Sequence, residues 1–334
     1  MKTGYVLLCA LLAFPALASR LVADDAGNKV TVPDQVTRIA DAWFAHHSVL
    51  MTLGAGSNIV ATVNHPVDRP WMFKINPALN NALQIKGISF NSEALLAHQT
   101  DVVFVAKGNP DVAAYHQANL PVLEMAFTDY PSLEHSVSAT ANVLGTEQAQ
   151  QRAVAYNRYL EESVAAVLTK TVSLSEQQRP SVLHIQSLTP LKVDGSNTLI
   201  DTWITLAGGK NAAQTISGNM KEVSPEQVLA WQPDIIILGQ GCGEISQSRY
   251  AQLFSGLKAV QAKKVWANPA GVFPWDRYGT ESALQIQWAA HQLHPALFAD
   301  TDMMSITRDF YRRFFDYPLS RDEAARILHG QPPA

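Results

Sequence analysis

Ser92–Val105 reads SEALLAHQTDVVFV and Ser224–Leu238 reads SPEQVLAWQPDIIIL, and the likeness of these two stretches decides the fold. Each begins with a helix-capping residue, continues as a short apolar helix, breaks at a polar turn that contains Asp, and ends in a buried strand. In the second stretch, Ser224, Pro225 and Gln227 combine an N-cap, a proline at the first helical position and a capping-box glutamine. The chain therefore carries an internal repeat of one α/β unit.

A second pair of matching stretches precedes the first pair. Val49–Ala61 reads VLMTLGAGSNIVA and Ile200–Ala212 reads IDTWITLAGGKNA, and each predicts an apolar helix closed by glycine. Short, continuous, β-branched-rich runs predict strands of parallel sheets covered on both faces. These runs are Ile59–Val63, Val102–Ala106, Val122–Met125, Val182–Ile185, Ile235–Leu238 and Lys264–Ala267. The predicted class is α/β with two similar lobes, for which 334 residues are sufficient.

Between the two halves, the segment 131–170 is predicted to be helical. Apolar residues recur every three to four positions on both sides of Gly145. A helix of this length can cross from one lobe to the other. The alternative is a helix packed within a single domain, but the repeat on either side favours the connector. We therefore expect an N-terminal lobe at 19–130, a connector helix at 131–170 and a C-terminal lobe at 171–334.

The first 18 residues have the layout of a secretory signal peptide. Lys2 precedes an apolar run from Tyr5 to Phe14, and Ala16-Leu17-Ala18 forms an A-x-A cleavage pattern. The alternative is a transmembrane anchor, but the run is too short to span a bilayer. We expect cleavage after Ala18 and export to the periplasm. Only Cys242 then remains, so no internal disulfide is expected.

Charge and motifs exclude several function classes. The net charge of −4 argues against nucleic acid as a partner, because nucleic-acid binders carry basic patches. The sequence contains no G-x-S-x-G, Walker A, H-E-x-x-H or C-x-x-C motif, so we expect neither catalytic residues nor a resident cofactor. A secreted hydrolase is the alternative from a different class. Turnover of an ester or phosphate would favour the hydrolase, whereas stoichiometric capture without turnover would favour a binding protein.

The order and spacing of several short motifs resemble the class III (helical-backbone) periplasmic binding proteins of ABC importers, which take siderophores, cobalamin and haem. The motifs include Thr31-Val32-Pro33, Asn58–Ala61, Glu93–Leu96, Leu206–Gly209 and the helix at Trp288–Leu297. The resemblance covers nearly the whole chain after residue 18. It implies two Rossmann-like lobes joined by a long connector helix, a ligand in the interlobe cleft and limited hinge motion. It also implies a monomer that delivers its ligand to an ABC permease in the inner membrane.

In open α/β sheets, ligands bind beyond the carboxyl ends of the strands, so the loops after the predicted strands are the candidate site. Arginine forks pair with carboxylate-like oxygens, and aromatic rings provide flat apolar walls. The alternative for each arginine is a structural ion pair, and for each tryptophan a place in the core under its loop. The predicted ligand-binding residues are Trp43, His46, His47, His65, Arg69, Lys107, Tyr130, Gln186, Trp275, Arg277 and Tyr278.

Cations and flat walls together suit an anionic metal chelate, so a ferric siderophore is the leading ligand. Cobalamin or haem, an oxyanion such as molybdate or tungstate, and a bare transition metal are the alternatives. His46 and His47 are metal-binding by type, but neighbours at a helix start point in different directions, so at most one is expected to face the cleft. No closed set of metal ligands is visible in the sequence. The resemblance also implies exposed acids that dock on the permease, for which Glu244 is the second-lobe candidate.

Overall fold

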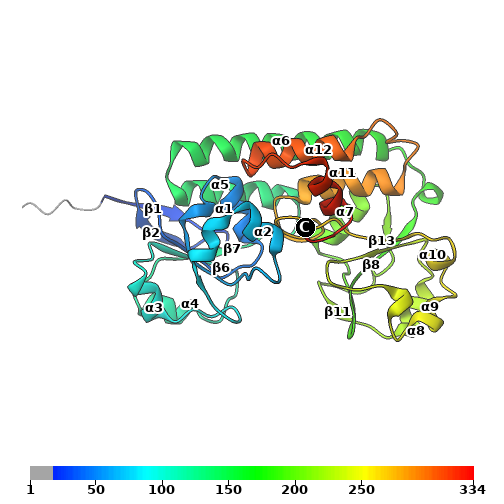
Figure 1. Ribbon diagram of the computed structural model, residues 1–334, viewed down its shortest axis with the longest axis horizontal. Helices are drawn as coiled ribbons and strands as arrows, with labels where there is room; N and C mark the ends of the chain where they lie inside the picture. Colours follow the sequence, from blue (N-terminus) through cyan, green and yellow to red (C-terminus); the bar gives the residue numbers. More distant parts are fainter. Residues whose placement is uncertain (1–17) are drawn as a thin grey trace, which may run out of the picture.

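The structure is a computed structural model that describes residues 18–334. Two lobes lie side by side, and a layer of helices runs along both of them on one side (Figure 1). The predicted signal peptide falls, except for Ala18, outside the described residues. The first strand, β1 (Ser19–Ala23), begins at the residue after the predicted cleavage point and pairs antiparallel with β2 (Lys29–Pro33).

The first lobe contains a five-stranded sheet in which every pairing is parallel. Its spatial order is β5 (Leu83–Gln84), β4 (Ile59–Thr62), β3 (Ile39–Asp41), β6 (Val102–Ala106) and β7 (Val122–Met125). The predicted strands at 102–106 and 122–125 are confirmed at their boundaries. The prediction worked here because a strand covered on both faces must be apolar throughout.

The second lobe contains a six-stranded sheet with a mixed edge. The path is β11 (Lys221–Glu222), β9 (Leu191–Val193), β8 (Ser181–Leu188), β12 (Ile235–Leu238) and β13 (Val265–Ala267), while β10 (Lys210–Asn211) pairs parallel with β8. The pairings β8–β9 and β9–β11 are antiparallel. The repeat is confirmed as β3–helix–β4 in one lobe and β8–helix–β10 in the other, and the β8–β9 hairpin is the addition that distinguishes the second lobe.

The helices occupy the remaining repeat positions and the layer that runs along both lobes. The capping box predicted at Ser224 and Gln227 is present at the start of α8. The remaining helices outside the connector are α1 (His46–Thr52), α2 (Pro70–Ile75), α3 (Ser92–Ala97), α4 (Val112–Gln117), α7 (Leu199–Leu206), α8 (Pro225–Trp231), α9 (Ala251–Phe254), α10 (Lys258–Gln261), α11 (Ser282–Leu293), α12 (Met303–Phe314) and α13 (Arg321–Leu328), with short 3-10 turns η1 (Gly56–Asn58), η2 (Pro77–Asn81), η3 (Glu176–Gln178) and η4 (Ile245–Gln247).

The connector range holds two helices, which corrects the prediction of one helix over 131–170. α5 (Tyr130–Leu144) and α6 (Glu147–Thr171) pack against each other, and Gly145 between them has φ of +74°. A side chain at Gly145 would place its Cβ 2.0 Å from the carbonyl oxygen of Asp34, so only glycine fits this turn. The Thr146 side chain then caps α6. Of these two helices, α6 is the one that spans the lobes, contacting α1 in the first and α7 in the second (Figure 1).

One continuous hydrophobic core joins the two lobes. It contains Ile39 and Phe104 from the first sheet, Val182 and Ile237 from the second, and Tyr156 from α6. The opposite face of each sheet packs in a separate cluster of its own lobe. Because packed cores resist continuous deformation, this shared core limits relative motion of the lobes.

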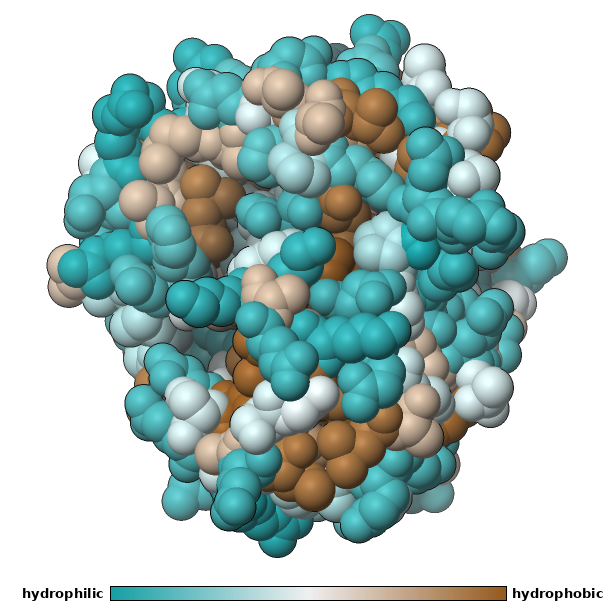
Figure 2. All heavy atoms as spheres, turned by 90° about the vertical axis from the view of Figure 1, so that its right-hand side faces the viewer, coloured by the Kyte–Doolittle hydropathy of each residue, from teal (hydrophilic) through white to brown (hydrophobic). Residues whose placement is uncertain are grey.

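The surface at the second-lobe end of the molecule is largely hydrophilic. Hydrophobic residues gather at its lower end, where α8 and α9 lie (Figure 2). Leu253 of α9 is 43% exposed there. Within residues 18–334, no helix has both the length and the apolar character needed to cross a bilayer.

Candidate ligand-binding site

Loops at the carboxyl ends of strands from the two lobes contact each other directly. Arg69, after β4, donates from Nη1 to Gln240 Oε1, after β12, over 3.2 Å. The Arg69 guanidinium also lies 4.9 Å from the centre of the Phe273 ring, in the loop after β13. Phe127, after β7, packs against Tyr278 with 5.7 Å between ring centres. We call the region around these contacts the interlobe site; it has the placement that the strand-end rule predicts.

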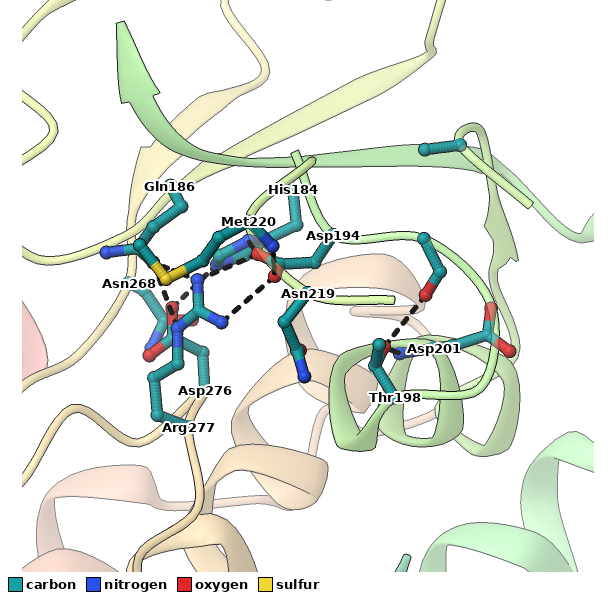
Figure 3. Close-up of polar contacts among 12 residues, drawn as sticks. His184, Gln186, Asp194, Thr198, Asp201, Asn219, Met220, Asn268, Asp276 and Arg277 are labelled. Atoms are coloured by element: carbon teal, nitrogen blue, oxygen red, sulfur yellow. Dashed lines mark hydrogen bonds and ion pairs between the residues drawn. The ribbon is translucent and has the colours of Figure 1, made fainter. Parts of the chain in front are cut away.

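On the second-lobe side, Arg277 is held by a carboxylate and an amide (Figure 3). Its Nη1 and Nη2 donate to the two oxygens of Asp194 over 3.0 and 2.8 Å, and its Nε donates to Gln186 Oε1 over 3.0 Å. Arg277 is 9% exposed and Asp194 is buried. This paired geometry fixes the orientation of the arginine before any ligand arrives. It also corresponds to the structural ion pair that the sequence left open as the alternative for this residue.

Behind Arg277, His184 of β8 bridges two buried carboxylates (Figure 3). Its Nδ1 lies 2.8 Å from Asp194 Oδ2, and its Nε2 lies 2.6 Å from Asp276 Oδ2. Burial alone would lower the pKa of His184, but the two carboxylates outweigh it and the pKa is raised. With both ring nitrogens donating, the imidazole carries a positive charge. His184 and Arg277 together then neutralise Asp194 and Asp276, so the cluster as a whole has no net charge.

Arg69 differs from Arg277 because its hydrogen-bond partners are uncharged. Nη1 donates to the carbonyl oxygen of Asp68 over 2.9 Å and to Gln240, while the buried Nε has no partner among the described residues. Burial lowers the pKa of Arg69, and Asp68 and Asp276 act in the opposite direction. The group remains charged at neutral pH, since arginine does not deprotonate in proteins. Arg69 is therefore a half-buried cation with hydrogen-bonding capacity to spare.

On the first-lobe side, both predicted histidines are buried and occupied. His46 Nδ1 lies 3.1 Å from Asp41 Oδ2, and its Nε2 lies 3.0 Å from Thr140 Oγ1. His47 Nδ1 lies 3.1 Å from the Trp43 carbonyl oxygen and its Nε2 2.6 Å from Thr62 Oγ1. Burial lowers the pKa of His47, which favours its neutral form. Every ring nitrogen of His46 and His47 therefore has a protein partner in this arrangement, which agrees with the expectation that at most one of them faces the cleft.

These histidines instead support an aromatic wall. The Trp43 ring stacks on His46 with 6.1 Å between centres and packs against Phe127 at 5.4 Å. Phe127 in turn meets Tyr278 from the other lobe. The Tyr278 hydroxyl accepts a hydrogen bond from Asn219 over 2.5 Å. Trp43 and Tyr278 are partly exposed, and both keep the position that the sequence predicted.

The other predicted site residues either hydrogen-bond within the protein or lie exposed on its surface. Trp275 and Tyr130 are buried; the indole of Trp275 donates to Glu281 over 3.0 Å and the hydroxyl of Tyr130 donates to the Ser282 carbonyl over 3.2 Å. His65 Nε2 lies 2.6 Å from the Ile85 carbonyl oxygen. Lys107 is exposed at the end of β6. The structure thus brings together Trp43, Arg69, Gln186, Arg277 and Tyr278 from the predicted set.

Several site residues were missed by sequence reasoning. Phe127 and Asp276 stand in the strand-end loops but carry no signal that separates them from their neighbours. His184 lies within β8, and nothing in the sequence near it indicates its two carboxylate partners. Asp194 follows the unpredicted β9, so no strand-end argument reached it. Among residues 18–334, no group of three or more His, Cys, Asp or Glu side chains is arranged to hold a metal ion.

A buried carboxylate anchors the loop that carries Arg277. Glu281 accepts hydrogen bonds from the backbone nitrogens of Val272 and Phe273 over 3.2 and 2.6 Å, from the Trp275 indole and from the Tyr311 hydroxyl. Burial, opposed by these donors, raises the pKa of Glu281 to about 7. Through these four hydrogen bonds, the Glu281 carboxylate joins the two ends of the loop 272–281 to each other and to Tyr311 of α12.

Glu281 predicts a pH-dependent stability. Its folded pKa of about 7 lies above the ordinary 4.5, so the fold favours the protonated acid. The contribution of Glu281 to the free energy of unfolding is complete below pH 4.5 and falls as pH rises to 7. The loss is at most about 3 kcal/mol, at 1.36 kcal/mol per pH unit. Urea unfolding across this range measures the slope. Glu281→Gln should flatten the curve, whereas Glu162→Gln on the exposed face of α6 should leave it unchanged. Equal slopes in wild type and Glu281→Gln would contradict the assignment.

Comparison with known proteins gives consistent likenesses. Residues 45–270 match the family model described as "Periplasmic binding protein". The molybdate-binding protein MolA of Haemophilus influenzae is 26% identical over 360 aligned residues, covering 98% of this chain and 100% of MolA. The structure of MolA bound to molybdate matches with a TM-score of 0.81 at 22% identity, covering 90% of this chain and 99% of that one. A periplasmic solute binding protein from Veillonella parvula matches with a TM-score of 0.79 at 25% identity, covering 93% and 97%.

Proposed function

The chain belongs to the periplasmic binding protein family, and from that premise we propose that it captures a tetrahedral oxyanion of the molybdate class between its lobes. As the substrate-binding protein of an ABC transporter, it binds a solute and does not transform it. The ligand assignment replaces the ferric siderophore that the sequence favoured. It rests on the charge distribution of the interlobe site and on the likeness to molybdate-binding MolA.

The observation that carries this proposal is the free hydrogen-bonding capacity of Arg69. A buried Nε–H without a partner is unfavourable unless an acceptor reaches it. An oxyanion offers only acceptor oxygens, so it matches such a donor and adds a favourable charge interaction. Arg277 faces the same region with its charge already compensated by Asp194. The site thus presents one unpaired cation and one paired cation, an arrangement suited to a small anion.

The spacing of the lobes supports a compact ligand. The contacts Arg69–Gln240 and Phe127–Tyr278 bridge the lobes directly, at 3.2 Å between atoms and 5.7 Å between ring centres. A bulky chelate would have to separate these pairs, whereas a small oxyanion requires less displacement. The aromatic wall of Trp43, Phe127 and Tyr278 then excludes water from the anion, which strengthens its electrostatic interactions.

A metal chelate such as a ferric siderophore is the second candidate. A cavity of about 840 Å³ adjoins the interlobe site at the carboxyl ends of β12 and β13, and Gln240 lines it. Its other walls include Gly239, Gly241, Asn268 and Gly330. A ligand that filled both this cavity and the interlobe site would be of chelate size. Cobalamin and haem belong to the same size class.

The proposal extends to export and transport. Residues 1–18 serve as a signal peptide, and the mature chain works as a monomer in the periplasm. It docks transiently on the permease through exposed acids, of which Glu244 is one. Glu244 stands at the start of η4, where its Oε2 accepts hydrogen bonds from Ser246 and Gln247 over 3.1 and 3.2 Å. These contacts hold the carboxylate on the surface in a defined orientation.

Calorimetric titration with molybdate, tungstate, sulfate and a ferric siderophore tests the ligand class. We expect saturable one-to-one binding of molybdate or tungstate. Arg69→Met should weaken that binding roughly tenfold or more, because a charge-assisted hydrogen bond contributes about 1.5–3 kcal/mol. Lys107→Met removes an exposed predicted cation and should change affinity less than about twofold. Binding of the ferric chelate with no response to any oxyanion would replace the proposal with the second candidate.

A further inference from the structure

The C-terminal segment lies between the two lobes (Figure 1). This segment, Ser320–Gln331, contains α13 and lies beyond the residues that match the family model. Ala324 and Ile327 of α13 are fully buried in the core that the lobes share. We call Ser320–Gln331 the strap.

One end of the strap is attached to the second lobe. The backbone nitrogen of Ala270 donates to the Ile327 carbonyl oxygen over 3.1 Å, just after β13. Gly330 packs so closely on the same loop that an added Cβ would lie 2.8 Å from the Asn268 carbonyl oxygen. Gly330 also has φ of +66°, so both its conformation and its packing favour glycine. The strap is therefore closely packed against the loop after β13, which also contains Arg277.

The same strap is attached to α2 of the first lobe by two contacts. The indole nitrogen of Trp71 donates to the Gln331 carbonyl oxygen over 2.8 Å, and Trp71 is 1% exposed. Lys74 Nζ lies 3.0 Å from Glu323 Oε1 and also 5.3 Å from the centre of the Trp71 ring. Trp71 and Lys74 are one helical turn apart, so both contacts hold the same face of α2.

α2 begins directly after Arg69, which occupies its N-cap position. A shift of α2 would therefore carry Arg69 away from Gln240 and Phe273. We propose that the strap is a second interlobe link, in addition to α6, which positions Arg69 in the interlobe site and restricts lobe opening. Trp71 and Lys74 are its positioning residues. The importance of Arg69 for the ligand rests on the proposed function, but the restriction of lobe opening does not.

Spin-label distance measurements on the ligand-free protein test the strap directly. Labels on cysteines at exposed positions Gln117 in α4 and Gln252 in α9, in a Cys242→Ser background, report the separation of the lobes. The double variant Trp71→Phe/Lys74→Met keeps an aromatic ring and an aliphatic chain but removes both contacts. We expect a broader distance distribution with a longer mean than in the unsubstituted protein. In stopped-flow mixing, bound molybdate should dissociate three- to tenfold faster from the double variant.

Lys170→Met is the matched control. Lys170 forms an ion pair with Asp300 at 2.9 Å and lies 4.9 Å from the centre of the Phe298 ring, so it has the same two interactions without contacting the strap. Its distance distribution should match the unsubstituted protein. Glu323→Gln, which removes the charge of a side chain that is 18% exposed, provides a second test if the double variant unfolds, and it should broaden the distribution partially. An unchanged distribution in the strap variants, or an equal change in Lys170→Met, would overturn the inference. If the strap variants change the distance distribution but the protein does not bind molybdate, the strap inference stands and the oxyanion proposal is rejected.

Discussion

Arg277→Ala is expected to weaken oxyanion binding at least tenfold and to lower the free energy of unfolding by about 3–5 kcal/mol. The loss of stability follows from the buried cluster. Without the guanidinium, Asp194 retains only His184 as a charged partner, and the cluster acquires a net negative charge. The loss of affinity follows because that charge would face the incoming anion. Ligand titration and urea unfolding at pH 7 measure the two effects separately.

A second substitution separates stability from affinity. In the Arg277→Ala background, Asp194→Asn removes the uncompensated charge, so it should recover part of the stability without recovering binding. Arg312→Ala is the control, because its ion pair with Asp309 is exposed and should contribute at most about 1 kcal/mol. Wild-type affinity in Arg277→Ala would remove this residue from the ligand site. Failure of Asp194→Asn to restore stability would show that the arginine acts by packing rather than by charge.

His184→Leu is expected to produce the second large effect, a loss of about 3–5 kcal/mol of unfolding free energy. His184 supplies the charged partner to Asp276, whose second oxygen is buried without a partner among the described residues. Leucine is similar in volume but leaves two neighbouring carboxylates without their shared cation. His116→Leu, at an exposed position in α4, should change stability by less than about 0.5 kcal/mol.

The pH dependence of the wild-type protein gives an independent check on His184. Its folded pKa is raised above the ordinary 6.5, so its contribution is complete below pH 6.5 and is lost as pH rises through the folded value. This window overlaps the range in which Glu281 acts only between pH 6.5 and 7, so the decline above pH 7 belongs to His184 alone of the two. We expect stability to decline above pH 6.5 in the wild type. Persistence of the same decline in His184→Leu would show that another group causes it.

Much of the fold could be predicted because its determinants are local in sequence. The boundaries of β6, β7 and β12 follow from short apolar runs, and the start of α8 follows from Ser224 and Gln227. The connector was predicted only in part. Gly145 interrupts the helical pattern, but its tight contact with the Asp34 carbonyl oxygen arises from a segment more than a hundred residues earlier. Local periodicity cannot report such a contact, so one helix was predicted where two exist.

The sequence predicted where the candidate site lies better than it predicted what each residue does there. The strand-end rule placed Arg69, Arg277 and Tyr278 in loops that the structure does bring together, whereas Gln186, predicted in the loop after a shorter strand, lies within β8. It could not distinguish the paired arginine from the unpaired one. Arg277 meets Asp194 across 83 positions of sequence, and Arg69 meets Gln240 across 171. His46 and His47 have the residue type of metal ligands, yet tertiary packing gives every ring nitrogen a protein partner.

The sequence by itself determined the two-lobed α/β class, the buried parallel strands and most of the loops from which the site is built. These depend on hydrophobic periodicity and capping, which act over a few residues. Only the tertiary structure decided that the Arg277 cluster is neutral, that Arg69 keeps an unpartnered donor, and that the strap holds α2. The physical reason is that charge compensation and burial depend on which distant groups meet, and several of those partners come from different lobes or from the C-terminal segment.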